Sequence, residues 1–267
     1  MITCFYINLK TAVQRRIELE KNFYANADNT FQLHRIEAIN KAQITTNTRG
    51  ISKTDKAVNR SHLDALRKAV RLKRTTLIME DDTALFPETF STIRHIENIL
   101  NPQIPIVIFT DIMVTTPNGM VEFCRLPKNT SIRLLNLSRI QYAGASSYLV
   151  TPSAAKIMEQ IAENCLNIRP WDMTLRQIIH KKLVFGRVTF PFVTSVNEYA
   201  EQSDNQPKHS QATDYLWNTF RRSLCIHPEQ FNLHQALHKI ENTFDTQQYR
   251  TLATIVAAHA SDKFVKK

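Results

Sequence analysis

The hydrophobic and polar positions in the first part of the chain alternate between two kinds of segment. Short apolar, β-rich runs that are typical of strands occupy residues 2–9, 31–40, 75–79 and 104–111. Longer segments with apolar residues near helical spacing occupy residues 11–26, 61–74, 87–100 and 151–165. Strands that alternate with helices in this way predict an α/β fold with a mainly parallel central sheet.

Local signals define some boundaries of these elements. Pro87 suits the first turn of its helix, and Thr151 followed by Pro152 is a typical helix start. The polar run 41–59 predicts an excursion or loop. After residue 210 the apolar residues follow a mostly helical pattern. We therefore expect a main domain over residues 1–204 and a helical C-terminal extension over residues 205–267 that packs on it.

Composition excludes several classes of protein. The four glycines are too far apart for a dinucleotide-binding or P-loop motif, and the four cysteines are too scattered for a disulfide scaffold or a cysteine-rich zinc site. The first ten residues do not resemble a signal peptide, and no apolar run has the length of a spanning helix. We expect a cytoplasmic protein.

Charge is unevenly distributed along the chain. The net charge is +10, and residues 1–79 carry 15 Lys and Arg against 6 Asp and Glu, a net charge of +9. Such a field favours phosphate-bearing ligands, nucleic acid or an anionic membrane, although it is also compatible with a surface that only keeps the protein soluble.

Three consecutive carboxylates, Glu80, Asp81 and Asp82, follow this basic region directly after the predicted strand 75–79. Residues that follow a buried strand lie at the carboxyl edge of the sheet, where α/β folds bind ligands. Adjacent carboxylates repel one another unless solvent or a cation compensates them, and Mg²⁺ and Mn²⁺ prefer such oxygen ligands. The cluster therefore indicates either a solvated turn or a cation site.

The order of several motifs resembles glycosyltransferase family 25, the bacterial lipopolysaccharide or lipooligosaccharide glycosyltransferases with a GT-A-like fold. The similar segments run in order over residues 2–204, and they are "YINLKTAVQRR", "RIEAIN", "SHLDALRKAV", "LIMEDDTAL", "AGASSYLVTPSAAKIM", "RPWDMTLRQI" and "EQSD". The resemblance implies a Rossmann-like nucleotide-sugar-binding domain over residues 1–204.

The resemblance also implies an activity and a cofactor. It implies transfer of a hexose, with galactose from UDP-galactose as the first candidate, to a lipooligosaccharide or other surface-glycan acceptor, with inversion. Mn²⁺ (or Mg²⁺) would bridge the diphosphate of the UDP-sugar to the acidic motif. Asp82 is then the direct metal ligand, Glu80 contacts ribose or the metal, and Asp81 mainly orients its neighbours.

Further candidate residues lie near the expected sheet edge. Asn8 and Leu9 end the first strand and could meet the uracil or ribose, while Arg15 or Arg16 could reach the diphosphate. The others are His62, in the Ser-His-Leu context of the resemblance, and Asp111, which ends the strand 104–111. Each of them could equally have a structural role.

An inverting transfer needs a general base for the acceptor hydroxyl. Asp172, which follows Pro170 and Trp171 at a predicted helix start, is the first candidate, although a helix cap would suit the same aspartate. Glu201 is the second candidate.

Alternatives from other classes remain open at this point. A pI of about 9.5 would also suit a nucleic-acid-binding protein, but no nucleic acid is expected because the chain has no recognisable nucleic-acid-binding motif. A metal-dependent nucleotidyltransferase would use the same acidic residues. The segments "WNTFRRSL" and "DKFVKK" combine aromatic and basic residues, which suits a peripheral contact with the inner membrane, and an ordinary helical cap is the other interpretation.

Overall fold

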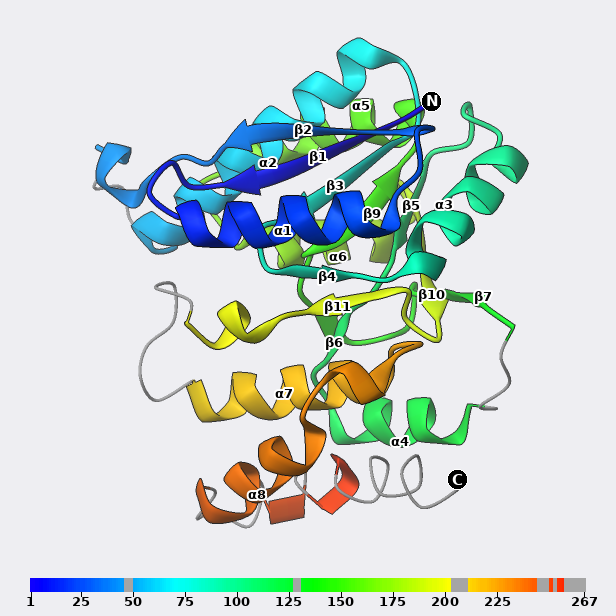
Figure 1. The fold of residues 1–267 in the computed structure, drawn as a ribbon. Helices are drawn as coiled ribbons and strands as arrows, with labels where there is room; N and C mark the ends of the chain where they lie inside the picture. Colours follow the sequence, from blue (N-terminus) through cyan, green and yellow to red (C-terminus); the bar gives the residue numbers. More distant parts are fainter. Residues whose placement is uncertain (46–49, 127–130, 203–210, 244–249, 252–253, 257–267) are drawn as a thin grey trace.

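A seven-stranded sheet forms the centre of the computed structural model, which describes residues 1–45, 50–126, 131–202, 211–243, 250–251 and 254–256 (Figure 1). In spatial order its strands are β2 (Phe31–Glu37), β1 (Ile2–Asn8), β3 (Thr76–Glu80), β9 (Ser147–Val150), β5 (Ile106–Phe109), β10 (Phe185–Phe190) and β7 (Arg133–Asn136).

Most strands of this sheet run in one direction. β1 pairs in parallel with β2 and β3, and β10 pairs in parallel with β5. β9 lies antiparallel between β3 and β5, and β7 lies antiparallel to β10 at the edge. Five strands therefore share a direction, and the predicted α/β fold with a mainly parallel sheet is confirmed.

Helices cover both faces of the sheet (Figure 1). One face carries α1 (Val13–Asn26) and α3 (Pro87–Ile99), and the other carries α2 (Lys53–Leu72), α5 (Pro152–Cys165) and α6 (Trp171–His180). Every residue of β1 is buried, with Cys4 and Tyr6 in the core cluster under α1 and α3 and with Phe5 and Ile7 in the cluster under α2 and α5. Burial on both faces explains why this strand is apolar without alternation.

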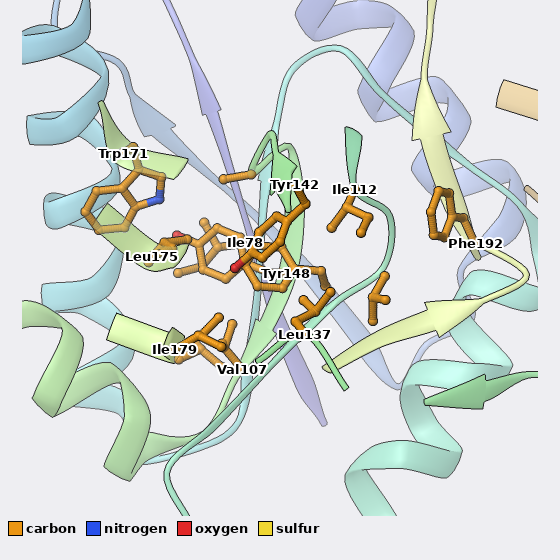
Figure 2. Packing of buried hydrophobic residues seen from close by; sticks show 14 of the residues in the cluster. Ile78, Val107, Ile112, Leu137, Tyr142, Tyr148, Trp171, Leu175, Ile179 and Phe192 are labelled. Carbon is orange, nitrogen blue, oxygen red and sulfur yellow. The ribbon is translucent and has the colours of Figure 1, made fainter. Parts of the chain in front are cut away.

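The packing of α6 positions one wall of the site described below. Trp171, Leu175 and Ile179 recur at intervals of four residues, which places them on one face of the helix. Figure 2 shows them beside Tyr148 and other core residues of the sheet. The start of α6, where Trp171 lies, is thereby fixed next to the carboxyl end of β3.

The sequence prediction was wrong about one boundary. Helix α2 begins at Lys53 rather than at residue 61, so the last seven residues of the predicted loop 41–59 are helical. Ser52 caps this helix by accepting a hydrogen bond from the backbone NH of Asp55, and Lys56 and Asn59 are buried although they are polar. The predicted starts at Pro87 and Thr151 are confirmed.

Smaller elements lie beyond the sheet edge at which β1 and β3 end (Figure 1). They are the two-stranded ribbons β4 (Thr83–Leu85) with β11 (Thr194–Val196) and β6 (Met113–Val114) with β8 (Tyr142–Ala143), the helices α4 (Pro117–Arg125), α7 (Gln211–Ser223) and α8 (Leu233–Thr243), and the 3₁₀ turns η1 (Lys41–Gln43), η2 (Glu198–Gln202) and η3 (Pro228–Gln230).

The part of the extension that the structure describes is helical, as predicted, and α7 packs against β6 and β11. The proposed boundary at residue 204 lies outside the described residues and stays a prediction. None of the described helices is both long enough and apolar enough to cross a membrane.

Candidate active site

The three consecutive carboxylates lie where β1 and β3 end side by side. The parallel register pairs Ile7 with Glu80, so Asn8 and Leu9 follow directly beside the acidic residues. A cavity of about 400 Å³ opens at this edge. Its lining includes Leu9, Arg15, His62 and all three carboxylates. We refer to it as the first cavity.

Each of the three carboxylates has a different environment. Glu80 Oε1 lies 3.1 Å from Nε2 of the buried His62. Asp81 accepts hydrogen bonds from Asn8 Nδ2 at 2.7 Å and from Arg15 Nη1 at 3.0 Å. Asp82 Oδ1 is buried and has no hydrogen-bond partner in the described structure. Asp82 is therefore the carboxylate whose charge the protein leaves uncompensated.

These environments shift the pKa values of the three carboxyl groups differently. Burial, followed by the charges of Glu80 and Asp81, raises the pKa of Asp82 from its ordinary value of 3.8 to about 7. Burial also raises the pKa of Asp81, although Arg15 and Asn8 oppose that rise. Burial acts in the same direction on Glu80, but the hydrogen bond and charge of His62, with Arg221 and Arg15, lower its pKa overall.

His62 is held in place from three sides. Its Nδ1 lies 3.1 Å from the Tyr148 hydroxyl, and its ring stacks on Trp171 with the ring centres 5.0 Å apart and the planes 11° apart. With Nε2 directed at Glu80, both ring nitrogens are engaged. His62 therefore orients Glu80 at the wall of the first cavity.

Some of the other residues predicted for the donor site line the first cavity, and others do not. Leu9 and Arg15 line the first cavity, whereas Asn8 lies behind it, where it accepts from Arg35 Nε at 3.0 Å and donates to Asp81. Arg16 lines neither this cavity nor the one described next. Of the two adjacent arginines, only Arg15 reaches the site.

A second cavity, of about 240 Å³, lies on the other side of Glu80 and Asp82. These two carboxylates line both cavities, so the acidic residues stand at their junction. The remaining walls come from the start of α2, the loop before β9, the start of α6 and one side of α7, with single residues from β6, β11 and η2. Their polar and aromatic members are Asp55, Ser146, Trp171, Asp172, Asp214, Asn218 and Arg221.

Asp172 lies in the wall of the second cavity, at the start of α6. Its Oδ1 accepts a hydrogen bond from the Met173 NH at 2.8 Å, and its Oδ2 accepts one from the Gly144 NH at 3.1 Å. Gly144 has a φ of +82°, a conformation that favours glycine. Asp172 therefore helps to hold the helix start, and it is also exposed to the cavity.

Asp111 is fully buried beneath the second cavity rather than open to it. Arg221 Nε donates a hydrogen bond to it at 2.9 Å, Arg221 Nη2 lies 2.7 Å from it as an ion pair, and the Ser146 hydroxyl donates at 3.1 Å. Arg221 is itself only 3% exposed, yet it lines the cavity. This ion pair attaches α7 to the strand end after β5 and to the loop before β9.

Glu201, the second candidate for the general base, is paired with Arg222. Its Oε2 accepts a hydrogen bond from Arg222 Nη2 at 3.0 Å, its Oε1 lies 2.8 Å from Arg222 Nη1 as an ion pair, and it lines neither cavity. Because Arg221 and Arg222 are both buried, the membrane interpretation of "WNTFRRSL" is wrong for these two arginines. The segment "DKFVKK" lies outside the described residues.

The sequence prediction missed several residues of the site. Lys41 lines the first cavity, and Asp55, Asn218 and Arg221 line the second. The adjacent arginines in an otherwise apolar stretch of α7 were the available signal, because an arginine on the apolar face of a helix needs a buried partner. Nothing in the sequence near Asn218 or Asp55 indicated that they reach the site.

Candidate metal ligands are few. Among the residues that the structure describes, no group of three or more His, Cys, Asp or Glu side chains is arranged to hold a metal ion. Asp82, with one unpaired buried oxygen, and Glu80, which shares both cavities with it, are the available pair.

Comparison with known proteins identifies the family. The model of glycosyltransferase family 25 (LPS biosynthesis protein) matches residues 1–175. The chain belongs to this family. The matched residues include the whole acidic cluster, His62 and Asp172, whereas Arg221 and α7 lie beyond them. The protein is therefore a glycosyltransferase, and both the predicted resemblance and the predicted class of enzyme are confirmed.

Other comparisons add little. No curated protein matches the chain. A solved structure titled "crystal structure of a glycosyltransferase involved in the glycosylation of the major capsid of PBCV-1" matches with 12% identity and a TM-score of 0.38, over 66% of this chain and 74% of that chain.

The raised pKa of Asp82 predicts a pH-dependent stability. The folded protein binds this proton more tightly than the unfolded chain does, so its stability falls as the pH rises from about 4 to about 7. In metal-free protein, Asp82→Asn should remove this loss. The difference in free energy of unfolding between Asp82→Asn and the wild type should shift in favour of the variant by roughly 2–3 kcal/mol between pH 5 and pH 8, as measured by urea denaturation.

A matched control is Asp64→Asn, the same chemical change on the outer side of α2. It should change stability little, and equally at both pH values. If Asp82→Asn is no more stable than the wild type at pH 8, Asp82 does not carry an uncompensated charge.

The buried pair of Arg221 and Asp111 predicts a large effect on stability. Arg221→Met should lower the free energy of unfolding by about 3–5 kcal/mol, because it leaves Asp111 buried without its partner. The double variant Arg221→Met/Asp111→Asn should recover part of this loss. A loss below about 1 kcal/mol in the single variant would show that the pair does not hold α7 in place.

Proposed function

We propose that the protein transfers a hexose, most simply galactose from UDP-galactose, to a saccharide acceptor of a bacterial surface glycan, with a divalent cation and with inversion. The observation that carries this proposal is the pair of cavities that share Glu80 and Asp82. A glycosyl transfer needs donor and acceptor on the two sides of one reacting centre. We assign the first cavity to the donor and the second to the acceptor.

The composition of the first cavity supports its assignment to a nucleotide sugar. It lies outside the carboxyl ends of parallel strands, where α/β folds bind nucleotides. Ile7, Leu9 and Ile39 provide apolar wall for a base and ribose, and Arg15 and Lys41 provide positive charge for a diphosphate. At about 400 Å³ it is within the range of ligand pockets.

The acidic residues suit a divalent cation that takes part of its coordination from the substrate. Mg²⁺-type ions are commonly bound by one or two carboxylates together with substrate phosphates and water, which agrees with a pair rather than a full set of protein ligands. The unpaired oxygen and raised pKa of Asp82 are what a carboxylate awaiting a cation would have. When bound, such a cation supplies charge stabilisation to the leaving diphosphate.

The chain's own residues then have distinct roles. Asp82 and Glu80 would hold the cation, His62 would keep Glu80 in place, and Asp81 would hold Arg15 at the cavity wall. In the second cavity Asp172 would accept the proton of the acceptor hydroxyl as general base. Glu201 remains the weaker candidate for that role because its charge is taken up by Arg222.

The setting of the reaction follows from the substrate. Nucleotide sugars are cytoplasmic substrates, so the proposed site of action is the cytoplasm, where a lipid-linked acceptor would be met at the inner face of the membrane. The basic region before the acidic cluster, with a net charge of +9 over residues 1–79, would draw the anionic donor toward the first cavity.

The test is a panel of UDP-hexoses with Mn²⁺, with release of UDP as the measurement. We expect turnover of at least one of them, highest with UDP-galactose, and a loss of at least about 100-fold in Asp82→Asn, since the cation then lacks its main ligand. Full activity of Asp82→Asn would overturn the role of Asp82. Release of a sugar phosphate in place of UDP would indicate a nucleotidyltransferase.

The adjacent arginines provide a matched pair of control variants. Arg15→Ala should raise KM for the nucleotide sugar, because Arg15 lines the first cavity, whereas Arg16→Ala should leave KM unchanged. Equal effects of the two variants would contradict the assignment of the first cavity to the donor.

A further inference from the structure

The charge of the second cavity differs from that of the first. Besides the shared Glu80 and Asp82, its described lining carries three more carboxylates, Asp55, Asp172 and Asp214. Arg221 is the one cation in that described lining, and its charge is already matched by two short contacts with Asp111. A cation bound by Glu80 and Asp82 would compensate those two, and the other three carboxylates would still face the acceptor.

The hydrogen-bonding groups of this cavity point to the same kind of ligand. Asn218 is only 3% exposed, it lines the cavity, and its Oδ1 has no partner in the described structure. A buried amide oxygen without a partner needs a donor. Together with the carboxylates, it gives the cavity a wall that mostly accepts hydrogen bonds. Hydroxyl and ammonium groups can donate to such a wall, whereas ionised carboxylate and phosphate groups cannot.

From these two observations we propose that the second cavity selects a neutral or amine-bearing saccharide as acceptor. It excludes acceptors that carry a carboxylate or phosphate beside the reacting hydroxyl. The exclusion arises because an anion there would face several like charges without a free cation among the described lining residues. This inference rests on the proposed function, since it concerns the acceptor side of the same reaction.

The test compares matched acceptors with a UDP-hexose that the enzyme turns over. The acceptors are the methyl glycoside of a neutral hexose, its amino-sugar analogue, its uronic acid analogue and its phosphate ester. Measured as kcat/KM, the neutral and amino acceptors should be used within about tenfold of each other, and the two anionic acceptors should be worse by at least about 100-fold.

Single Asp→Asn variants test whether the charge of the second cavity, and not its shape, causes the discrimination between acceptors. Asp55→Asn should lower the discrimination between neutral and uronic acid acceptors by roughly tenfold, and Asp214→Asn provides a second, independent variant. Asn at position 55 can still accept the hydrogen bond from Ser52, so the helix start should be retained. Asp64→Asn, on the same helix but outside both cavities, should leave the discrimination unchanged.

The outcomes distinguish this inference from the proposed function. If a UDP-hexose is turned over but the anionic acceptors are used as well as the neutral one, the inference is wrong and the proposed function stands. If discrimination is present but Asp55→Asn and Asp214→Asn both leave it unchanged, the charge explanation is wrong. If no UDP-hexose is hydrolysed or transferred, the proposed function itself fails.

Discussion

Three consecutive carboxylates crowd the end of β3, and the groups that offset their negative charge determine much of the surrounding structure. His62 contacts Glu80 through Nε2, and Arg15 and Asn8 donate hydrogen bonds to Asp81. Among the residues that the structure describes, Oδ1 of Asp82 has no such partner, and the pKa of Asp82 rises to about 7. A protein selected for stability alone would gain by replacing it, since an uncompensated buried charge is costly. This arrangement supports the proposal that the site receives a ligand with positive charge.

The C-terminal part of the chain also shapes the site. The family model ends at residue 175, but one wall of the second cavity is formed by α7. The ion pair of Arg221 with Asp111 joins this helix to the sheet edge, and the same guanidinium helps to lower the pKa of Glu80. Residues beyond the family match thus shape both the cavity and the electrostatics of the matched residues. Differences among relatives in this region would be a direct route to different acceptors.

How much the sequence predicts depends on how local each feature is. The strand that ends in the acidic cluster, the helix starts at Pro87 and Thr151, and the position of the cluster at the sheet edge follow from local patterns, and all are observed. The second cavity could not be predicted, because its walls come from many segments that are far apart in the chain. Arg221 and Asp111 are 110 positions apart, and no local pattern relates them. The start of α2 was missed because its first turns are polar and are held by contacts from elsewhere.

In the proposed mechanism, Asp82 binds a cation, which in turn binds the diphosphate of a nucleotide sugar in the first cavity. Crystals grown with Mn²⁺ and UDP, with the anomalous scattering of manganese recorded, test it most directly. We expect an anomalous peak within coordination distance of Asp82 Oδ1, and a diphosphate between that peak and Arg15. A manganese peak away from Asp82, or UDP bound outside the first cavity, would contradict it.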